Sequence, residues 1–176
     1  MTLKALKTNK YYFNKPAFSL IEIMAVIMIV SLGLVGTVNL AVQNIKAQTL
    51  NEDNLIAYQL AQEALELARQ IRDTNWMLGN NWLESLTPGR YCVDYRNVEI
   101  LSINAVNDCP LSRDGNNFYF SPSIDDIADS VPSNFSRMIE IGSGTSSVPV
   151  LATVSWISRN GGIQNYTVAT MFYDWY

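Results

Sequence analysis

One uninterrupted apolar segment limits what this chain can fold into. From Phe18 to Val42 the sequence reads FSLIEIMAVIMIVSLGLVGTVNLAV, in which Glu22 is the only charged residue. As a helix rising about 1.5 Å per residue, this segment is long enough to cross the hydrocarbon core of a bilayer, about 30 Å thick. We therefore predict one membrane-spanning helix at residues 18–42.

The charges around this segment predict its orientation. Residues 1–17 contain four lysines and no acidic residue, and the next basic residue after the segment is Lys46. Because basic residues concentrate on the cytoplasmic side of membrane helices, we expect a cytoplasmic leader and a single-pass protein of the cytoplasmic (inner) membrane. A cleaved secretory signal peptide fits poorly, since its apolar region is only about 7 to 15 residues long.

The composition argues against most kinds of catalytic and metal site. The chain has no histidine, which removes the commonest general base and metal ligand. Asp114-Gly115-Asn116 lacks the spaced acidic residues and closing glutamate of a calcium loop and is interpreted as a polar turn. Asp125, Asp126 and Asp129 are interpreted as a solvated loop or helix start rather than a metal site. Paired carboxylates stay open as acid and base groups, but nothing singles out a pair. We expect no enzyme activity, no cofactor and no metal.

Nucleic-acid binding is a further class that the charge disfavours. The twelve Lys and Arg residues against sixteen Asp and Glu residues give a formal net charge of -4 at pH 7. Four of the basic residues belong to the leader, so the chain beyond it carries a net charge of -8. Such a surface repels phosphate backbones, and we expect no direct nucleic-acid partner.

Glu22 is the feature that a simple membrane anchor does not explain. A carboxylate inside an apolar span costs at least a few kcal/mol unless it is paired, so an acidic residue at such a position is a functional candidate.

Residues 15–30, KPAFSLIEIMAVIMIV, resemble the N-terminal signature of type IV prepilins and of the related type II secretion pseudopilins. The resemblance implies that prepilin peptidase cleaves between Ala17 and Phe18 and that the new amine of Phe18 is methylated. Ala17 stands where the family nearly always has glycine. The resemblance also implies that Glu22, the fifth residue of the mature chain, pairs with the N-terminal amine of a neighbouring subunit and so sets the axial register.

The sequence stays helical after the apolar segment. Residues 43–75 contain no Gly or Pro, and no helix breaker separates Ser19 from Asp73, which predicts one element of about 55 residues. Within residues 43–75, apolar residues recur at spacings of three and four and so form one face of the helix: Ala57, Leu60, Ala61, Ala64, Leu67, Ala68 and Ile71. The opposite face is charged, with Glu63 and Glu66, and is interpreted as solvated.

The stretch from Leu60 to Trp76, LAQEALELARQIRDTNW, also resembles one that is common in minor pilins of the PilV-like group.

Short strand-like runs in residues 76–176 predict an extracytoplasmic, β-rich head. A long helix followed only by strands predicts an α+β fold, in which the amphipathic helix covers one face of an antiparallel sheet. The pilin resemblance implies the same architecture. Asn160-Gly161-Gly162 favours positive φ and predicts an antiparallel hairpin of the last two runs. The runs are Arg90 to Tyr95, Val98 to Ile103, Phe118 to Ser121, Arg137 to Ile141, Val148 to Ser158 and Ile163 to Tyr173.

The two cysteines permit one disulfide bond in an oxidising compartment. A bond between Cys92 and Cys109 would close a loop, which in the chain-entropy model stabilises the folded chain by about 3 kcal/mol. The spacing is far from C-x-x-C, which favours a structural bond over a redox-active pair. Two cysteines without histidine do not complete a tetrahedral zinc site.

The resemblance to prepilins implies a structural subunit. We expect a minor-pilin-like protein that stays in the lipid bilayer until an assembly machinery packs it with other pilin subunits into a type IV pilus or related surface filament. A type II secretion or competence pseudopilin is the nearest alternative. An uncleaved bitopic receptor or adhesin module and a membrane-tethered hydrolase are alternatives of other classes. Cleavage before Phe18 would distinguish a filament subunit from the receptor or adhesin module and from the hydrolase, since neither of these requires it.

Overall fold

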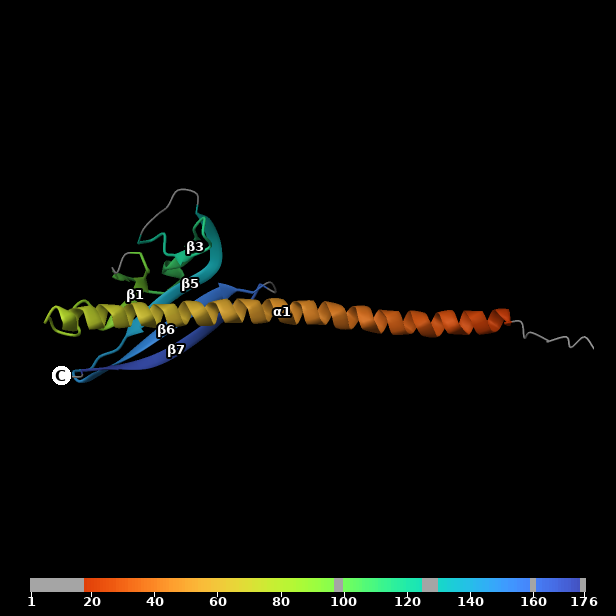
Figure 1. The fold of residues 1–176 in the computed structure, drawn as a ribbon, viewed down its shortest axis with the longest axis horizontal. Helices are drawn as coiled ribbons and strands as arrows, with labels where there is room; N and C mark the ends of the chain where they lie inside the picture. Colours follow the sequence, from red (N-terminus) through yellow and green to blue (C-terminus); the bar gives the residue numbers. More distant parts are fainter. Residues whose placement is uncertain (1–17, 97–99, 125–129, 159–160, 175–176) are drawn as a thin grey trace, which may run out of the picture. The chain divides into compact units, whose positions relative to one another are not determined.

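The computed structural model describes residues 18–96, 100–124, 130–158 and 161–174. The chain divides into two compact units, Met1–Lys46 and Ala47–Tyr176, and the division falls inside the long helix. The elements are α1 (Leu20–Met77), β1 (Gly89–Val93), β2 (Ile100–Ser102), a 3-10 helix η1 (Val106–Asp108), β3 (Pro110–Arg113), β4 (Tyr119–Phe120), β5 (Val131–Ile141), β6 (Ser147–Ile157) and β7 (Ile163–Tyr173) (Figure 1).

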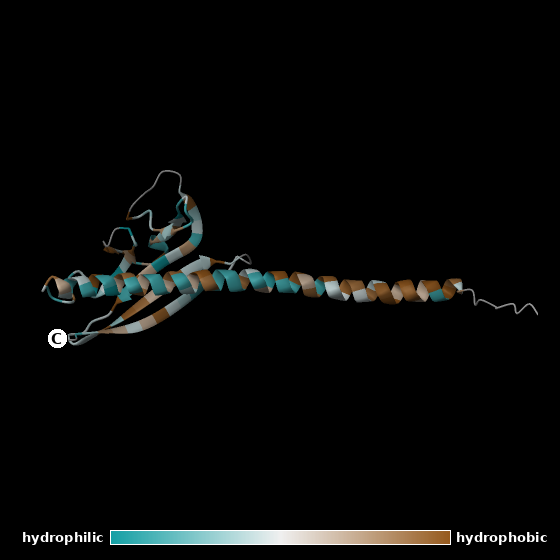
Figure 2. Ribbon diagram, in the orientation of Figure 1, coloured by the Kyte–Doolittle hydropathy of each residue, from teal (hydrophilic) through white to brown (hydrophobic). Residues whose placement is uncertain are grey.

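The first part of α1 is apolar on all sides and the second part is predominantly polar outside its buried stripe (Figure 2). Within the described residues, α1 is the one helix long and apolar enough to cross a membrane, and none of its apolar window is buried. The hydroxyls of Ser31 and Thr37 donate to the carbonyls of Ile27 and Leu34, at 2.7 and 2.8 Å. These bonds give both hydroxyls a partner without water, and the helix is compatible with a single-pass membrane protein.

The second part of α1 packs against the sheet, as the periodicity predicts. Four alanines on this face, Ala57, Ala61, Ala64 and Ala68, are wholly buried. These alanines belong to one hydrophobic core with buried residues of the sheet, and larger residues between them, such as Leu60 and Leu67, belong to the same core. The predicted stripe is buried in full, together with Leu65.

α1 ends at Met77, slightly beyond the predicted boundary at 75. Gly79 adopts φ +73, the left-handed conformation that commonly ends helices. The amide of Asn80 donates to the carbonyl of Asn75 at 2.9 Å, and the amide of Gly79 donates to Trp76 at 3.0 Å. These bonds satisfy carbonyls of the last turn.

The strands that the structure describes form one antiparallel, seven-stranded sheet with β5 at its centre. One edge of β5 pairs with β6, and its other edge pairs with β1 and β3. β2 extends the sheet from β1, β4 extends it from β3, and β7 pairs with β6. The structure therefore confirms the predicted α+β arrangement, with the amphipathic part of α1 against the sheet (Figure 1).

The predicted terminal hairpin is present. β6 and β7 pair without interruption from Ser147 with Tyr173 to Ile157 with Ile163. Gly161 has φ +80, which is the positive value expected of the turn. Asn160, predicted to share this turn, lies outside the described residues.

The sequence patterns missed one strand and half of another. β3 was not expected, and β5 begins at Val131 rather than at Arg137. Pro110 and Pro132 lie in these segments, and proline is disfavoured in strands because it lacks a backbone donor. The two segments pair with each other, with Ser112 opposite Pro132, so tertiary pairing overrides the local propensity.

Candidate functional site

The first candidate site is the start of α1. The amides of Glu22 and Ile23 both donate to the carbonyl of Ser19, at 3.0 and 3.2 Å, and these bonds form the first helical turn. Glu22 lies in this turn, where the positive end of the helix dipole favours a negative charge. Among the residues that the structure describes, Glu22 has no ion-pair partner.

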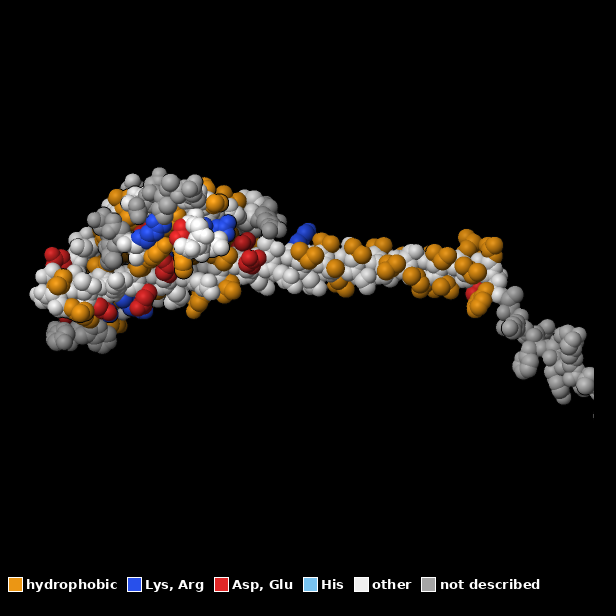
Figure 3. Space-filling model, turned by 45° about the horizontal axis from the view of Figure 1, so that its top comes forward, with side chains coloured by type: hydrophobic (Ala, Val, Ile, Leu, Met, Phe, Trp, Pro, Cys, Tyr) orange, Lys and Arg blue, Asp and Glu red, His pale blue; other side chains and the backbone are white. Residues whose placement is uncertain are grey.

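Phe18 and Glu22 lie on the same side of this helix end. Together with Ile23, Val26 and Ile27 they line a surface hollow of about 270 Å³. Phe18 is 77% exposed, and hydrophobic side chains cover the apolar part of α1 (Figure 3). The residues predicted to take part in assembly are therefore neighbours on one exposed apolar surface. Ala17, on the other side of the predicted cleavage point, lies outside the described residues.

The predicted disulfide between Cys92 and Cys109 is present. The two Cα atoms are 5.6 Å apart, and both cysteines are fully buried. The bond links β1 to the residue that follows η1. It therefore joins the region of the sheet built on β1 to the region built on β3.

A buried arginine lies beside this disulfide and was not anticipated from the sequence. The side chain of Arg137, on β5, is 0% exposed. Its Nη2 donates to the carbonyl of Val93 at 2.9 Å, and its backbone amide donates to the carbonyl of Cys109 at 3.0 Å. Arg137 thus connects β5 to both segments that the disulfide joins.

Glu63 on α1 supplies the charge opposite Arg137, which corrects its interpretation as a solvated residue. Its Oε1 lies 3.1 Å from Nη1 of Arg137, and its side chain is 36% exposed. The interpretation holds for Glu66, whose side chain is 72% exposed and whose Oε2 lies 2.9 Å from Nη1 of Arg69. The ion pair of Glu63 and Arg137 ties the helix to the centre of the sheet.

The strand alternation contained a signal for Arg137 that the sequence interpretation did not use. On β5 the residues opposite Trp156, Ala152 and Val150 are Phe135, Ile139 and Ile141, all buried. Arg137 falls in the same phase, two residues from Phe135 and two from Ile139. A charged residue in the apolar phase of a strand requires a buried partner, and the facing helix was the place to seek it.

The acidic loops that the structure describes serve as turns. Oδ1 of Asp114 accepts the amides of Asn116 and Phe118, both at 2.9 Å. Among the described residues no group of three or more His, Cys, Asp or Glu side chains could hold a metal ion. The cluster Asp125, Asp126 and Asp129 lies outside the described residues.

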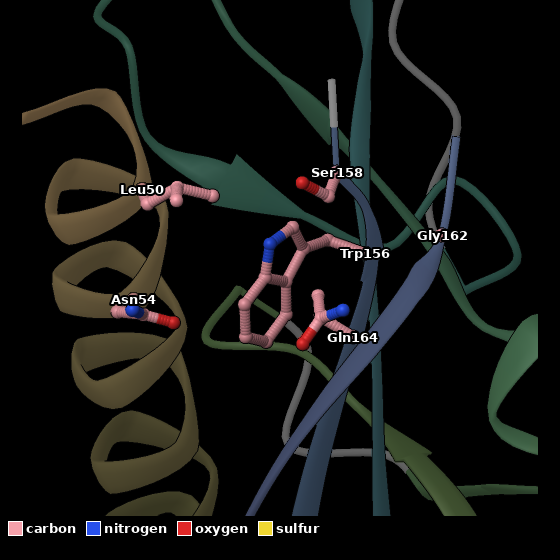
Figure 4. A pocket seen from close by; sticks show the side chains of 6 residues that line it. All are labelled: Leu50, Asn54, Trp156, Ser158, Gly162 and Gln164. Atoms are coloured by element: carbon pink, nitrogen blue, oxygen red, sulfur yellow. The ribbon is translucent and has the colours of Figure 1, made fainter. Parts of the chain in front are cut away.

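The head contains a pocket between α1 and the β6–β7 hairpin (Figure 4). Its volume is about 300 Å³, and no charged side chain is among its described lining residues. Trp156 forms its floor at 5% exposure, with an indole nitrogen that is buried and has no hydrogen-bond partner. In Figure 4 this nitrogen faces the helix. The pocket is lined by Leu50, Asn54, Trp156, Ser158, Gly162 and Gln164.

A second, wider pocket of about 530 Å³ lies at the C-terminal end of α1. Arg72 fixes the neighbouring aromatic residues, because its guanidinium lies 4.7 Å from the ring centre of Trp76 and 4.8 Å from that of Phe172. The pocket is lined by Trp76, Gly79, Asn80, Asn81, Trp82, Thr145 and Asp174. Among their described lining residues, neither pocket brings together an acid and a base in a catalytic arrangement.

Comparison with known proteins identifies no relative. No family model, no curated protein and no solved structure matches this chain.

Proposed function

We propose that this protein is a minor-pilin-like structural subunit, which prepilin peptidase processes before Phe18 and which assembles into a type IV pilus or related filament. The observation that carries the proposal is the exposed apolar start of α1, where Phe18 and Glu22 line one hollow. A simple anchor needs the apolar surface but has no use for the carboxylate.

The proposed assembly step is the burial of this surface between subunits. The amine of Phe18 in one subunit would pair with the carboxylate of Glu22 in its neighbour, and the apolar side chains around them would exclude water. In such a dry environment an unpaired charge is strongly unfavourable, so the pair would admit one axial register and reject others.

The architecture of the head supports the same proposal. α1 passes from an apolar part with no buried residues to a part whose stripe is buried against the sheet. One helix of this kind can occupy a filament core with its first part and carry a globular head on its second part. The buried disulfide supports a location of the head in an oxidising compartment, outside the cytoplasm.

Processing is tested by mass spectrometry of the protein recovered from membranes and from sheared surface material. We expect a mature chain that begins at N-methylated Phe18 and is two mass units lighter than its dithiol form. A chain that still contains residues 1–17 in cells with an active prepilin peptidase would contradict the proposal and favour the uncleaved bitopic receptor or adhesin module.

The role of Glu22 is tested by the substitution Glu22→Leu. We expect normal membrane insertion and an incorporation into filaments that falls by about tenfold or more, because the amine of the neighbouring subunit would be buried without a partner. Quantitative immunoblotting of membranes and sheared filaments measures both.

Ser31→Leu is the matched control, since Ser31 is a polar residue of the same apolar segment whose hydroxyl already bonds to its own helix. This variant is expected to assemble normally. Unchanged incorporation of Glu22→Leu would refute the pairing role.

A further inference from the structure

The pocket between α1 and the β6–β7 hairpin contains a buried donor without an acceptor. Trp156 is only 5% exposed, and its indole nitrogen is buried without a hydrogen-bond partner. Buried donors in folded proteins almost always have an acceptor, because an unpaired donor has lost its bonds to water without replacement. This nitrogen faces the helix across the pocket (Figure 4), so a molecule bound in the pocket can supply the acceptor.

The pairing of the hairpin gathers further polar groups around this nitrogen. Gln164 lies opposite Trp156, and Ser158 follows Trp156 by two residues, so the three side chains lie on the same face of the sheet. Asn54 lines the pocket from α1. Among the described residues, none hydrogen-bonds to the side chain of Asn54, Ser158 or Gln164. Four side chains with unused hydrogen-bonding groups therefore surround one space.

The space is suited to a ligand of one small ring. Its volume of about 300 Å³ is at the lower end of the range for small-molecule sites, about 300 to 1,000 Å³. Gly162 keeps it open, since a Cβ there would approach Nε2 of Gln164 only to 3.8 Å. Leu50 flanks the indole nitrogen in Figure 4 and is 43% exposed, so a change of its rotamer admits the ligand to this nitrogen.

The lining favours a neutral ligand that both donates and accepts hydrogen bonds. The indole N–H only donates, so the ligand must offer an acceptor. In Figure 4 the amide oxygens of Asn54 and Gln164 point toward the indole, and these oxygens only accept. An anion would offer them no donor, and no charged side chain is among the described lining residues to pair with it. An apolar ligand would leave the indole N–H unpaired.

We propose that this pocket binds the neutral terminal monosaccharide of a glycan. Each hydroxyl group of such a ring donates one hydrogen bond and accepts others, so neighbouring hydroxyls match the indole N–H and the two amides together. Asn54 and Gln164 are exposed at the rim, which leaves room for the rest of a glycan in solvent. This inference does not depend on prepilin processing, because every described lining residue belongs to the unit Ala47–Tyr176.

Binding is measured by NMR of the isotopically labelled full-length protein, in micelles of a detergent without sugar headgroups. The probes are the methyl pyranosides of glucose, galactose and mannose, in which the methyl group replaces the remainder of the glycan. We expect at least one to bind with a dissociation constant of about 1 mM. Its binding should move the indole N–H resonance of Trp156 downfield, since a hydrogen bond deshields the proton. Trp156→Phe identifies this resonance by its loss.

Two substitutions at the rim test the ligand contacts without altering the buried core. Asn54→Leu and Gln164→Met replace exposed amides by side chains of similar size that make no hydrogen bond, so each should weaken binding of the same glycoside about tenfold. Asn165→Leu is the matched control and should bind as the unsubstituted protein does, because Asn165 follows Gln164 on β7 and its side chain lies on the other face of the sheet. Tryptophan fluorescence during denaturation verifies that the three variants are folded.

The proposal is overturned if none of the three glycosides binds, if binding leaves the indole resonance of Trp156 unmoved, or if Asn54→Leu and Gln164→Met bind as tightly as Asn165→Leu. Stronger binding of N-methylacetamide than of any glycoside would overturn it as well, because the pocket would then recognise an amide of a protein rather than a sugar.

Discussion

Replacement of both cysteines, Cys92→Ala with Cys109→Ala, is expected to lower the free energy of unfolding of the head by about 3 kcal/mol. The disulfide closes the chain over a sequence separation of 17 residues, and its loss frees that loop in the unfolded state. Alanine is preferred to serine because both sites are fully buried and a hydroxyl would need a partner there. Denaturation of the full chain in detergent, followed by tryptophan fluorescence, measures the change.

Tryptophan fluorescence reports on the head alone, since Trp76, Trp82, Trp156 and Trp175 all follow the apolar segment. The unsubstituted protein under reducing conditions is the control and should unfold at about the same denaturant concentration as the double variant, because both lack the cross-link. Equal stability of the oxidised protein and the double variant would contradict a stabilising role for the disulfide.

Glu63→Gln is expected to destabilise the head by about 2 kcal/mol, because the buried guanidinium of Arg137 loses its counter-charge. Removal of one partner from a fully buried pair costs about 3 to 5 kcal/mol. Glu63 is 36% exposed, so water screens part of the interaction and the expected loss is smaller. The same denaturation experiment measures this loss.

Glu66→Gln is the matched control on the same helix. Its carboxylate is largely exposed and pairs with Arg69 one turn away, so we expect a change of about 0.5 kcal/mol or less. A loss for Glu63→Gln that is no larger than the loss for Glu66→Gln would show that the pair with Arg137 does not stabilise the head.

A double substitution distinguishes the effect of the unpaired buried charge from the effect of side-chain shape at this site. Glu63→Leu with Arg137→Met replaces both charged groups by apolar side chains, and it should recover most of the stability that Glu63→Gln loses. Recovery would mean that the buried charge, rather than the shape of the site, makes Glu63 necessary.

A helix or strand could be predicted from the sequence where the residues that specify it lie within that element or an adjoining turn. The stripe of α1 and the hairpin of β6 and β7 follow from spacings of three and four, from alternation and from a glycine turn. Each of these signals lies within one element or one turn. The Cys92–Cys109 bond was foreseeable because the chain has only two cysteines.

β3 and the first half of β5 were not predictable in this way, because their prolines weaken the local strand signal and the two segments stabilise each other by pairing. The order of the strands likewise appears only in the tertiary structure. Neither property is written in any single stretch of sequence.

The candidate functional residues can be separated in the same way, into those predictable from one helix and those that depend on tertiary contacts. The sequence by itself determined the apolar segment, the single charge of Glu22 within it and the position of Phe18 one helical turn earlier, because these features need only the geometry of one helix. Only the tertiary structure decided that Glu63 faces the buried Arg137 rather than water. The physical reason is that a charge at one position of a helix becomes a buried partner only when a residue 74 positions away arrives opposite it.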